Sequence, residues 1–181
     1  MNKIYLILLA GIMSCLVLSC EKDLTYTGKD VVEFSPYNVE YANQQEFEDG
    51  YFTSDMDSET TDSIQVSLVG PQRNKDIVIN FEIVDKFYLL INEAKIVLTL
   101  PEGITSNEYE EYTTTAVKDD NYTLLNNDLT TTIKKNNSFG HIGFKTKNTT
   151  GSNLYILIVL KKSSDIDVNE NYKFYRLKIE D

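Results

Sequence analysis

Tryptophan is absent from this sequence of 181 residues, which contains one histidine, three prolines and two cysteines. Both cysteines, Cys15 and Cys20, lie in or beside the N-terminal apolar segment, so the remaining chain has no thiol. That distribution excludes an internal disulfide, a thiolate metal site and a cysteine nucleophile from the rest of the chain. One histidine cannot build a histidine-based metal site. We therefore expect no metal or other cofactor.

Basic residues are also scarce, since 17 lysines and arginines face 28 acids and give a net charge of −11. Residues 1–19 hold one lysine and no acid, so the chain from residue 20 onward has a net charge of −12. A field of this sign repels nucleic acid and anionic lipid headgroups. We expect no nucleic-acid partner.

The N-terminus has the layout of a secretory signal. Lys3 precedes an apolar run over residues 4–18, which is interrupted by Gly11 and Ser14. The run is shorter than the ~20 residues that a membrane-spanning helix needs. A positive start, a short apolar segment and a small residue at the cleavage point are typical of a signal peptide. We predict that residues 1–19 are removed; the alternative is a permanent N-terminal anchor helix.

The residues Val17-Leu18-Ser19-Cys20 resemble a bacterial lipobox, in which the cysteine becomes the lipidated N-terminus. A second match ends at Cys15, but cleavage there would leave an apolar tail. Cys20 lies at the boundary with charged residues, so we predict lipidation at Cys20 and a membrane anchor that does not span the bilayer. Acids just after it, Glu21 and Asp23, resemble the export signal of Bacteroidota surface lipoproteins. This implies an outer-membrane, cell-surface location, with the periplasm as the alternative.

From residue 31 onward, short segments alternate apolar and polar side chains with the two-residue period of strands. Residues 154–160 are instead apolar on both parities, which predicts a central strand buried on both faces. The pattern predicts an all-β fold: one Ig-like antiparallel sandwich of two sheets over residues 31–181, after a tether at 20–30. We expect a solvated loop over 54–61, within an irregular stretch at 37–61, and one or two helical turns over 106–112.

Residues 116–144 contain Ala116, the run Asp119-Asp120-Asn121-Tyr122-Thr123 and a turn at Asn136. This stretch resembles Calx-β-like sandwiches and a pattern common in Bacteroidota surface lipoproteins. In that family a glycine stands at position 119, a calcium-ligating aspartate at 121 and a glycine at 136. The resemblance implies a sandwich fold and a left-handed backbone at Asn136. Asp119 and Asp120 remain as possible calcium ligands, and the alternative is a solvated acidic turn.

Catalytic patterns are missing. His141 is flanked by apolar side chains of the opposite parity, so we expect it to face solvent or the rim of the sandwich. There is no nucleophile-elbow or phosphate-binding loop motif. We expect no enzymatic activity.

Three residues are candidates for binding or modification. Tyr109 and Tyr112 lie with Phe87-Tyr88 in a long insertion, where exposed aromatic rings can bind a ligand; alternatively, they cover a sheet edge. Ser63, in Asp62-Ser63-Ile64, resembles a Bacteroidota O-glycosylation site, although a plain strand start fits equally. We expect an accessory binding module of a nutrient (glycan) uptake system, whose partner is a glycan or surface protein. The alternative is an adhesive or structural pilus-like module that pairs through sheet edges.

Overall fold

The computed structural model describes residues 28–34, 46–48, 50–148 and 153–180. The predicted signal peptide and Cys20 lie outside these residues, as does most of the predicted tether. The described chain is built from strands, with a 3₁₀ turn, η1 (Asn127–Leu129), before β10.

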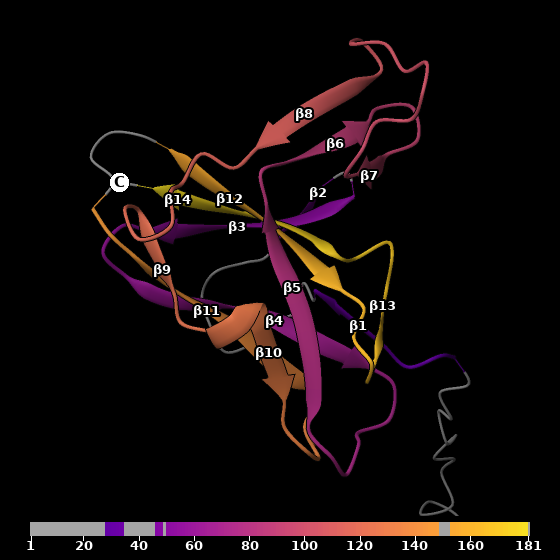
Figure 1. The fold of residues 1–181 in the computed structure, drawn as a ribbon, viewed down its shortest axis with the longest axis vertical. Coiled ribbons are helices and arrows are strands. Elements are labelled where there is room, and N and C mark those ends of the chain that lie inside the picture. The colour runs from indigo at the N-terminus through magenta and orange to yellow at the C-terminus, as the bar shows by residue number, and fades with distance from the viewer. Residues whose placement is uncertain (1–27, 35–45, 49, 149–152, 181) are drawn as a thin grey trace, which may run out of the picture.

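Three sheets contain these strands (Figure 1). The five-stranded sheet has the order β13 (Asp167–Val168), β1 (Val31–Phe34), β4 (Thr61–Val69), β11 (Phe139–Thr146), β9 (Tyr122–Leu124). The six-stranded sheet has the order β10 (Thr130–Ile133), β5 (Ile77–Val84), β12 (Leu154–Lys161), β14 (Phe174–Glu180), β3 (Tyr51–Asp57), β2 (Glu46–Glu48). The third sheet has the order β7 (Lys95–Val97), β6 (Lys86–Leu90), β8 (Tyr109–Thr113).

The main core lies between the five-stranded and six-stranded sheets. Side chains of one parity from each strand point into it, because successive residues of a strand face opposite sides. From β4 these are Ile64, Val66 and Leu68, all buried, and β5 and β11 contribute their apolar residues in the same way. The predicted all-β sandwich is therefore confirmed. Asn136 has a φ of 60°, which confirms the left-handed turn predicted there.

Two features of the topology differ from the expected antiparallel arrangement. β1 pairs with β13 in parallel, and β14 pairs with β3 in parallel. Each parallel partner comes from a segment far away in sequence, so hairpin patterns could not reveal the pairing.

The solvated loop expected over 54–61 is wrong, because β3 runs through residue 57 and β4 begins at Thr61. Thr53, Asp55 and Asp57 of β3 lie at positions that face away from the main core, while Phe52 and Met56 are buried in it. The hydroxyl of the buried Tyr175 side chain donates a 2.7 Å hydrogen bond to the Ser54 hydroxyl of β3. The helical turns expected over 106–112 are also wrong, because β8 occupies Tyr109–Thr113 and pairs with β6.

Strand β12 is buried on both faces, as its sequence predicts. Ile156, Ile158 and Leu160 belong to the main core, whereas Leu157 and Val159 belong to a second core on the outer face of the six-stranded sheet. The third sheet covers this second core. It contributes the buried side chains of Phe87, Leu89 and Ile96.

Aromatic rings join the third sheet to the sheet below it. The Phe87 ring lies 5.6 Å from Tyr51, 5.5 Å from Tyr112 and 5.7 Å from Phe174, measured between ring centroids. Thr114, just after β8, accepts a 3.0 Å hydrogen bond from the Leu157 amide and donates one of 2.7 Å to the Val84 carbonyl. The third sheet is thus fixed to the sandwich by both packing and hydrogen bonds.

An ionic cluster fixes the start of the described chain to the sandwich. Asp167 on β13 pairs with Lys29 and with Lys162, the latter at 2.6 Å. Arg73 donates a 2.9 Å hydrogen bond to the Asp30 carboxylate. Lys162, and then Lys29, lower the pKa of the Asp167 carboxyl to about 2 from its ordinary value of 3.8. Residues 29 and 30, at the end of the predicted tether, are therefore held by the folded domain.

Replacing Phe87 by alanine is expected to lower the free energy of unfolding by about 3–5 kcal/mol, because a fully buried ring leaves a cavity between the sheets. Urea denaturation followed by circular dichroism measures this. Ile91→Ala is the matched control, since Ile91 follows β6 but is 49% exposed and should change the value by less than about 0.5 kcal/mol. Equal effects of the two variants would contradict the assigned second core.

Asp167→Asn is expected to lower the melting temperature at neutral pH. The folded pKa of Asp167 lies below its ordinary value, so its contribution to stability is present above pH 3.8 and is lost as the pH falls toward 2. The difference in melting temperature between wild type and variant should therefore become smaller as the pH falls from 3.8 toward 2. Thermal unfolding monitored by circular dichroism measures it. Asp120→Asn, at an exposed turn outside the cluster, is the control for the same change of side chain. A difference in melting temperature at Asp167 that does not change with pH would refute the linkage.

Candidate binding surface

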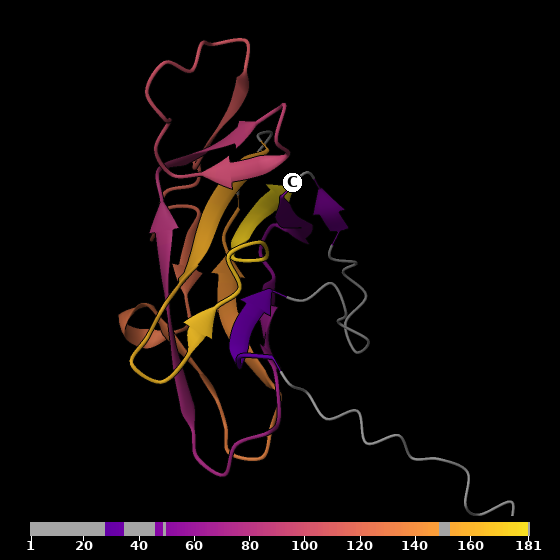
Figure 2. The same ribbon diagram turned by 90° about the vertical axis from the view of Figure 1, so that its right-hand side faces the viewer.

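The third sheet is built from the long insertion between β5 and β9. It lies at one end of the long axis of the molecule, away from the point where β1 begins (Figures 1 and 2). An insertion at the end of a rigid sandwich is a common place for ligand recognition. The two predicted binding tyrosines, Tyr109 and Tyr112, both lie on β8 of this sheet.

The structure does not bring Tyr109 and Tyr112 to the same surface. They are three residues apart on one strand and therefore face opposite sides. Tyr112 lies across from Phe87 and packs 5.3 Å from the Tyr51 ring in the second core. Burial raises the pKa of the Tyr112 phenol, and its hydroxyl donates a 2.8 Å hydrogen bond to Glu110. Tyr112 thus holds the third sheet in place.

Arg176 on β14 extends the packing around Tyr112. Its guanidinium carbon lies 5.0 Å from the centre of the Tyr112 ring and 3.9 Å from that of Tyr155. A cation between two aromatic faces is stabilised by the electron density of both rings. This contact adds a link between β8 and the six-stranded sheet.

Tyr109 lies on the opposite face, which points away from the sandwich. Its ring meets the Tyr88 ring edge-on at 5.3 Å between centroids, and both side chains are half-buried. Beside them, Lys86 and Glu111 form a 3.1 Å ion pair, and the Lys86 amine lies 5.8 Å from the centre of the Tyr88 ring. We call Tyr88, Tyr109, Lys86 and Glu111 the tyrosine face. It offers aromatic surface beside two opposite charges.

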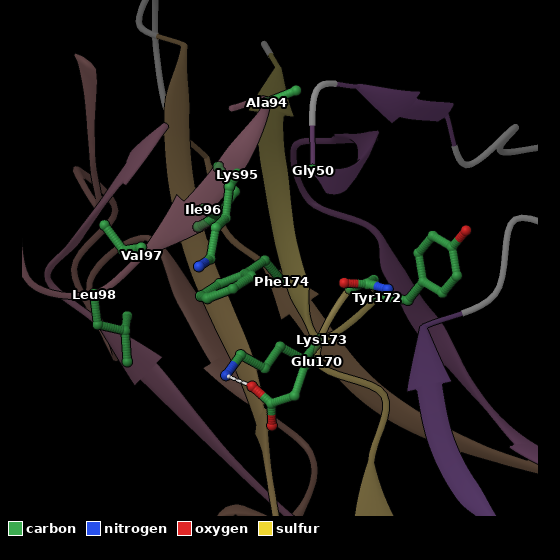
Figure 3. A pocket seen from close by; sticks show the side chains of 11 residues that line it. Gly50, Ala94, Lys95, Ile96, Val97, Leu98, Glu170, Tyr172, Lys173 and Phe174 are labelled. Carbon is green, nitrogen blue, oxygen red and sulfur yellow. Dashed lines mark hydrogen bonds and ion pairs between the residues drawn. The ribbon is translucent and has the colours of Figure 1, made fainter. Parts of the chain in front are cut away.

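A cleft of about 630 Å³ runs along β7, at the edge of the third sheet (Figure 3). Ligand pockets commonly span ~300–1,000 Å³, so this cleft is large enough for a small molecule. Two stretches far apart in the sequence form most of its walls, residues 94–98 and 170–174. Gly50, with a φ of 100°, closes one end, and an added Cβ there would lie 3.3 Å from the Ala94 carbonyl oxygen.

The cleft is charged and partly apolar. Lys95 extends from β7 over the cleft, while Lys173 and Glu170 form a 2.5 Å ion pair at the other wall (Figure 3). The Lys173 amine also lies 5.3 Å from the centre of the Phe174 ring. Sequence reasoning did not find this cleft. Its lining has no linear motif, and only the packing of β7 against the segment before β14 brings the two stretches together.

The Ser63 hydroxyl lies half-buried on β4, 3.4 Å from His141 Nδ1 on the neighbouring β11. His141 is exposed, which confirms the orientation predicted for it. Asp62 accepts a 2.7 Å hydrogen bond from the Ser63 amide. No carboxylate hydrogen-bonds the His141 ring within the described part of the chain, so a serine–histidine–carboxylate relay is not assembled there.

Asp119 and Asp120 lie in an exposed turn before β9. Asp119 has a φ of 68°, and its backbone amide donates a 2.7 Å hydrogen bond to the Tyr122 carbonyl. The Asn121 side chain accepts a 2.7 Å bond from the Val117 amide, which closes the turn. Across the residues that the structure describes, no three acidic, histidine or cysteine side chains are grouped to hold a metal ion. No third carboxylate, histidine or cysteine among these residues joins the two aspartates.

No family model matches the chain, and no curated protein matches it in sequence. The structure, in the ranges that it describes, contains no helix long and apolar enough to cross a membrane.

Proposed function

We propose that this protein is a non-enzymatic lipoprotein, anchored in the outer membrane through Cys20 and displayed on the cell surface. In this proposal it binds glycan as an accessory module of a nutrient-uptake system. The observation that carries the proposal is the third sheet. This sheet lies at one end of the sandwich, away from the start of β1 (Figures 1 and 2). It carries the tyrosine face on β6 and β8, and its β7 lines the cleft.

The chemistry of this end suits a carbohydrate. Aromatic rings offer flat apolar surface to the C–H faces of sugars, and neighbouring charged groups can hydrogen-bond to hydroxyls. Tyr88 and Tyr109 supply the rings, and Lys86 and Glu111 supply a donor and an acceptor beside them. The cleft adds a concave surface next to this face.

Lipidation at Cys20 is expected to decide where the protein resides. Cys20→Ala should remove the lipid and release the protein from the membrane fraction, because two or more acyl chains are what hold a protein stably on a bilayer. Mass spectrometry of the N-terminus and membrane fractionation measure this. Cys15→Ala is the control and should retain the lipid. Membrane retention of the unlipidated Cys20 variant would contradict the anchor, and full protection from protease on intact cells would contradict surface display.

Glycan binding is expected to depend on Tyr109. On a glycan array probed with the full chain, Tyr109→Ala should weaken the bound signal by roughly 2- to 10-fold, the equivalent of about 0.5–1.5 kcal/mol of aromatic stacking. Phe139→Ala is the matched control, because Phe139 is 53% exposed but lies on the five-stranded sheet. Tyr112→Ala is not a suitable test, since it would also disturb the second core.

One result would contradict the binding surface and another would contradict the function. Undiminished glycan binding by Tyr109→Ala would remove the tyrosine face from the proposal. Silence across the array, together with self-association of the full chain in solution, would favour the adhesive or pilus-like module instead.

A further inference from the structure

The cleft along β7 has a local charge opposite to that of the whole chain. The charged side chains that line it are Lys95, Lys173 and Glu170, which leaves one net positive charge in a chain of net charge −11. At physiological salt the screening length is ~8 Å, so a group inside the cleft responds mainly to these neighbours and only weakly to distant acids. The cleft is therefore a local site for a negative charge.

The two lysines of the cleft are held differently. Lys173 is neutralised by Glu170 at 2.5 Å and lies against the Phe174 ring. The Lys95 side chain makes no hydrogen bond or ion pair with the other described residues and extends over the cleft (Figure 3). Its ammonium group thus keeps three donors available for a ligand.

The rest of the lining limits the shape of that ligand. Ile96 and Leu98 give the wall apolar surface, and Asn171 and Glu170 give it amide and carboxylate groups. Gly50 lies against the outer edge of β7, where a Cβ added to it would be 3.5 Å from the Ile96 nitrogen. The chain at Gly50 therefore obstructs the edge of β7 along which an added peptide strand would have to pair. A compact ring with one charge fits better than an extended acidic peptide.

We propose that this cleft binds a hexuronate residue of an acidic polysaccharide, with the sugar carboxylate on the Lys95 ammonium. The ring's apolar face lies against Leu98, and its hydroxyls meet Asn171 and Glu170. This inference rests on the proposed glycan-binding function and narrows it to carboxylated sugars. A hydrogen bond between two charged groups is stronger than one between neutral groups, so the carboxylate decides which glycan binds.

Isothermal titration calorimetry of the full chain tests this with trimers of galacturonate, mannuronate and guluronate. The comparison ligand is fully methyl-esterified trigalacturonate, which has the same rings but no charge. We expect at least one acid trimer to bind, the ester to bind roughly 10-fold more weakly or not at all, and affinity to fall as salt is raised. Lys95→Gln should weaken the acid trimer by roughly 10-fold or more. Lys145→Gln, an exposed lysine on β11, should leave binding unchanged.

Each opposite result overturns the inference. These results are no binding of any acid trimer, equal binding of acid and ester, or unchanged binding by Lys95→Gln when its melting temperature matches wild type. If neutral glycans still bind on the array through Tyr109, the proposed function survives and only the hexuronate assignment fails. If the array is silent as well, both fail together.

Discussion

Burial of both faces of β12 is the constraint on which the rest of the architecture depends. A strand with apolar residues at every position from Ile156 to Leu160 cannot leave either side in water, because each exposed aliphatic side chain would forfeit roughly 1.5–3 kcal/mol of burial free energy. The five-stranded sheet covers one face. The second face needs its own cover, and the insertion between β5 and β9 supplies it as the third sheet.

Because the third sheet covers the outer face of β12, its own two faces have different roles. Its inner face presents Phe87 and Tyr112 to the second core, where their rings contact Tyr51 and Phe174 of the six-stranded sheet. Its outer face is then free to carry polar and aromatic groups at fixed positions. A binding surface on a packed sheet is more precisely placed than one on a loop. The cleft at β7 arises from the same packing, since the edge of the third sheet overhangs the segment that leads into β14.

Several charged side chains of the described residues are arranged in pairs of opposite sign. Most described lysines pair with acids at the surface, where such pairs contribute little to stability but keep an acidic chain from repelling itself locally. The cluster of Asp167, Lys29 and Lys162 fixes the point where the chain enters the sandwich. Lys95 departs from this pattern because its charge faces a cleft without a partner in the described chain.

Local sequence patterns determined most of the strands and the sandwich. Alternation in β4, β5 and β14, and the double-sided β12, could be recognised because side-chain direction in a strand depends only on parity. Two strands could not be recognised from their polar composition. The outward Thr53 and Asp55 of β3 are typical of a loop, and the glutamates of β8 are typical of the first turn of a helix. Only the tertiary structure decided the parallel pairings, the separation of Tyr109 from Tyr112 and the cleft itself. These depend on contacts between segments many residues apart, and a local period carries no information about which distant segment covers a given face.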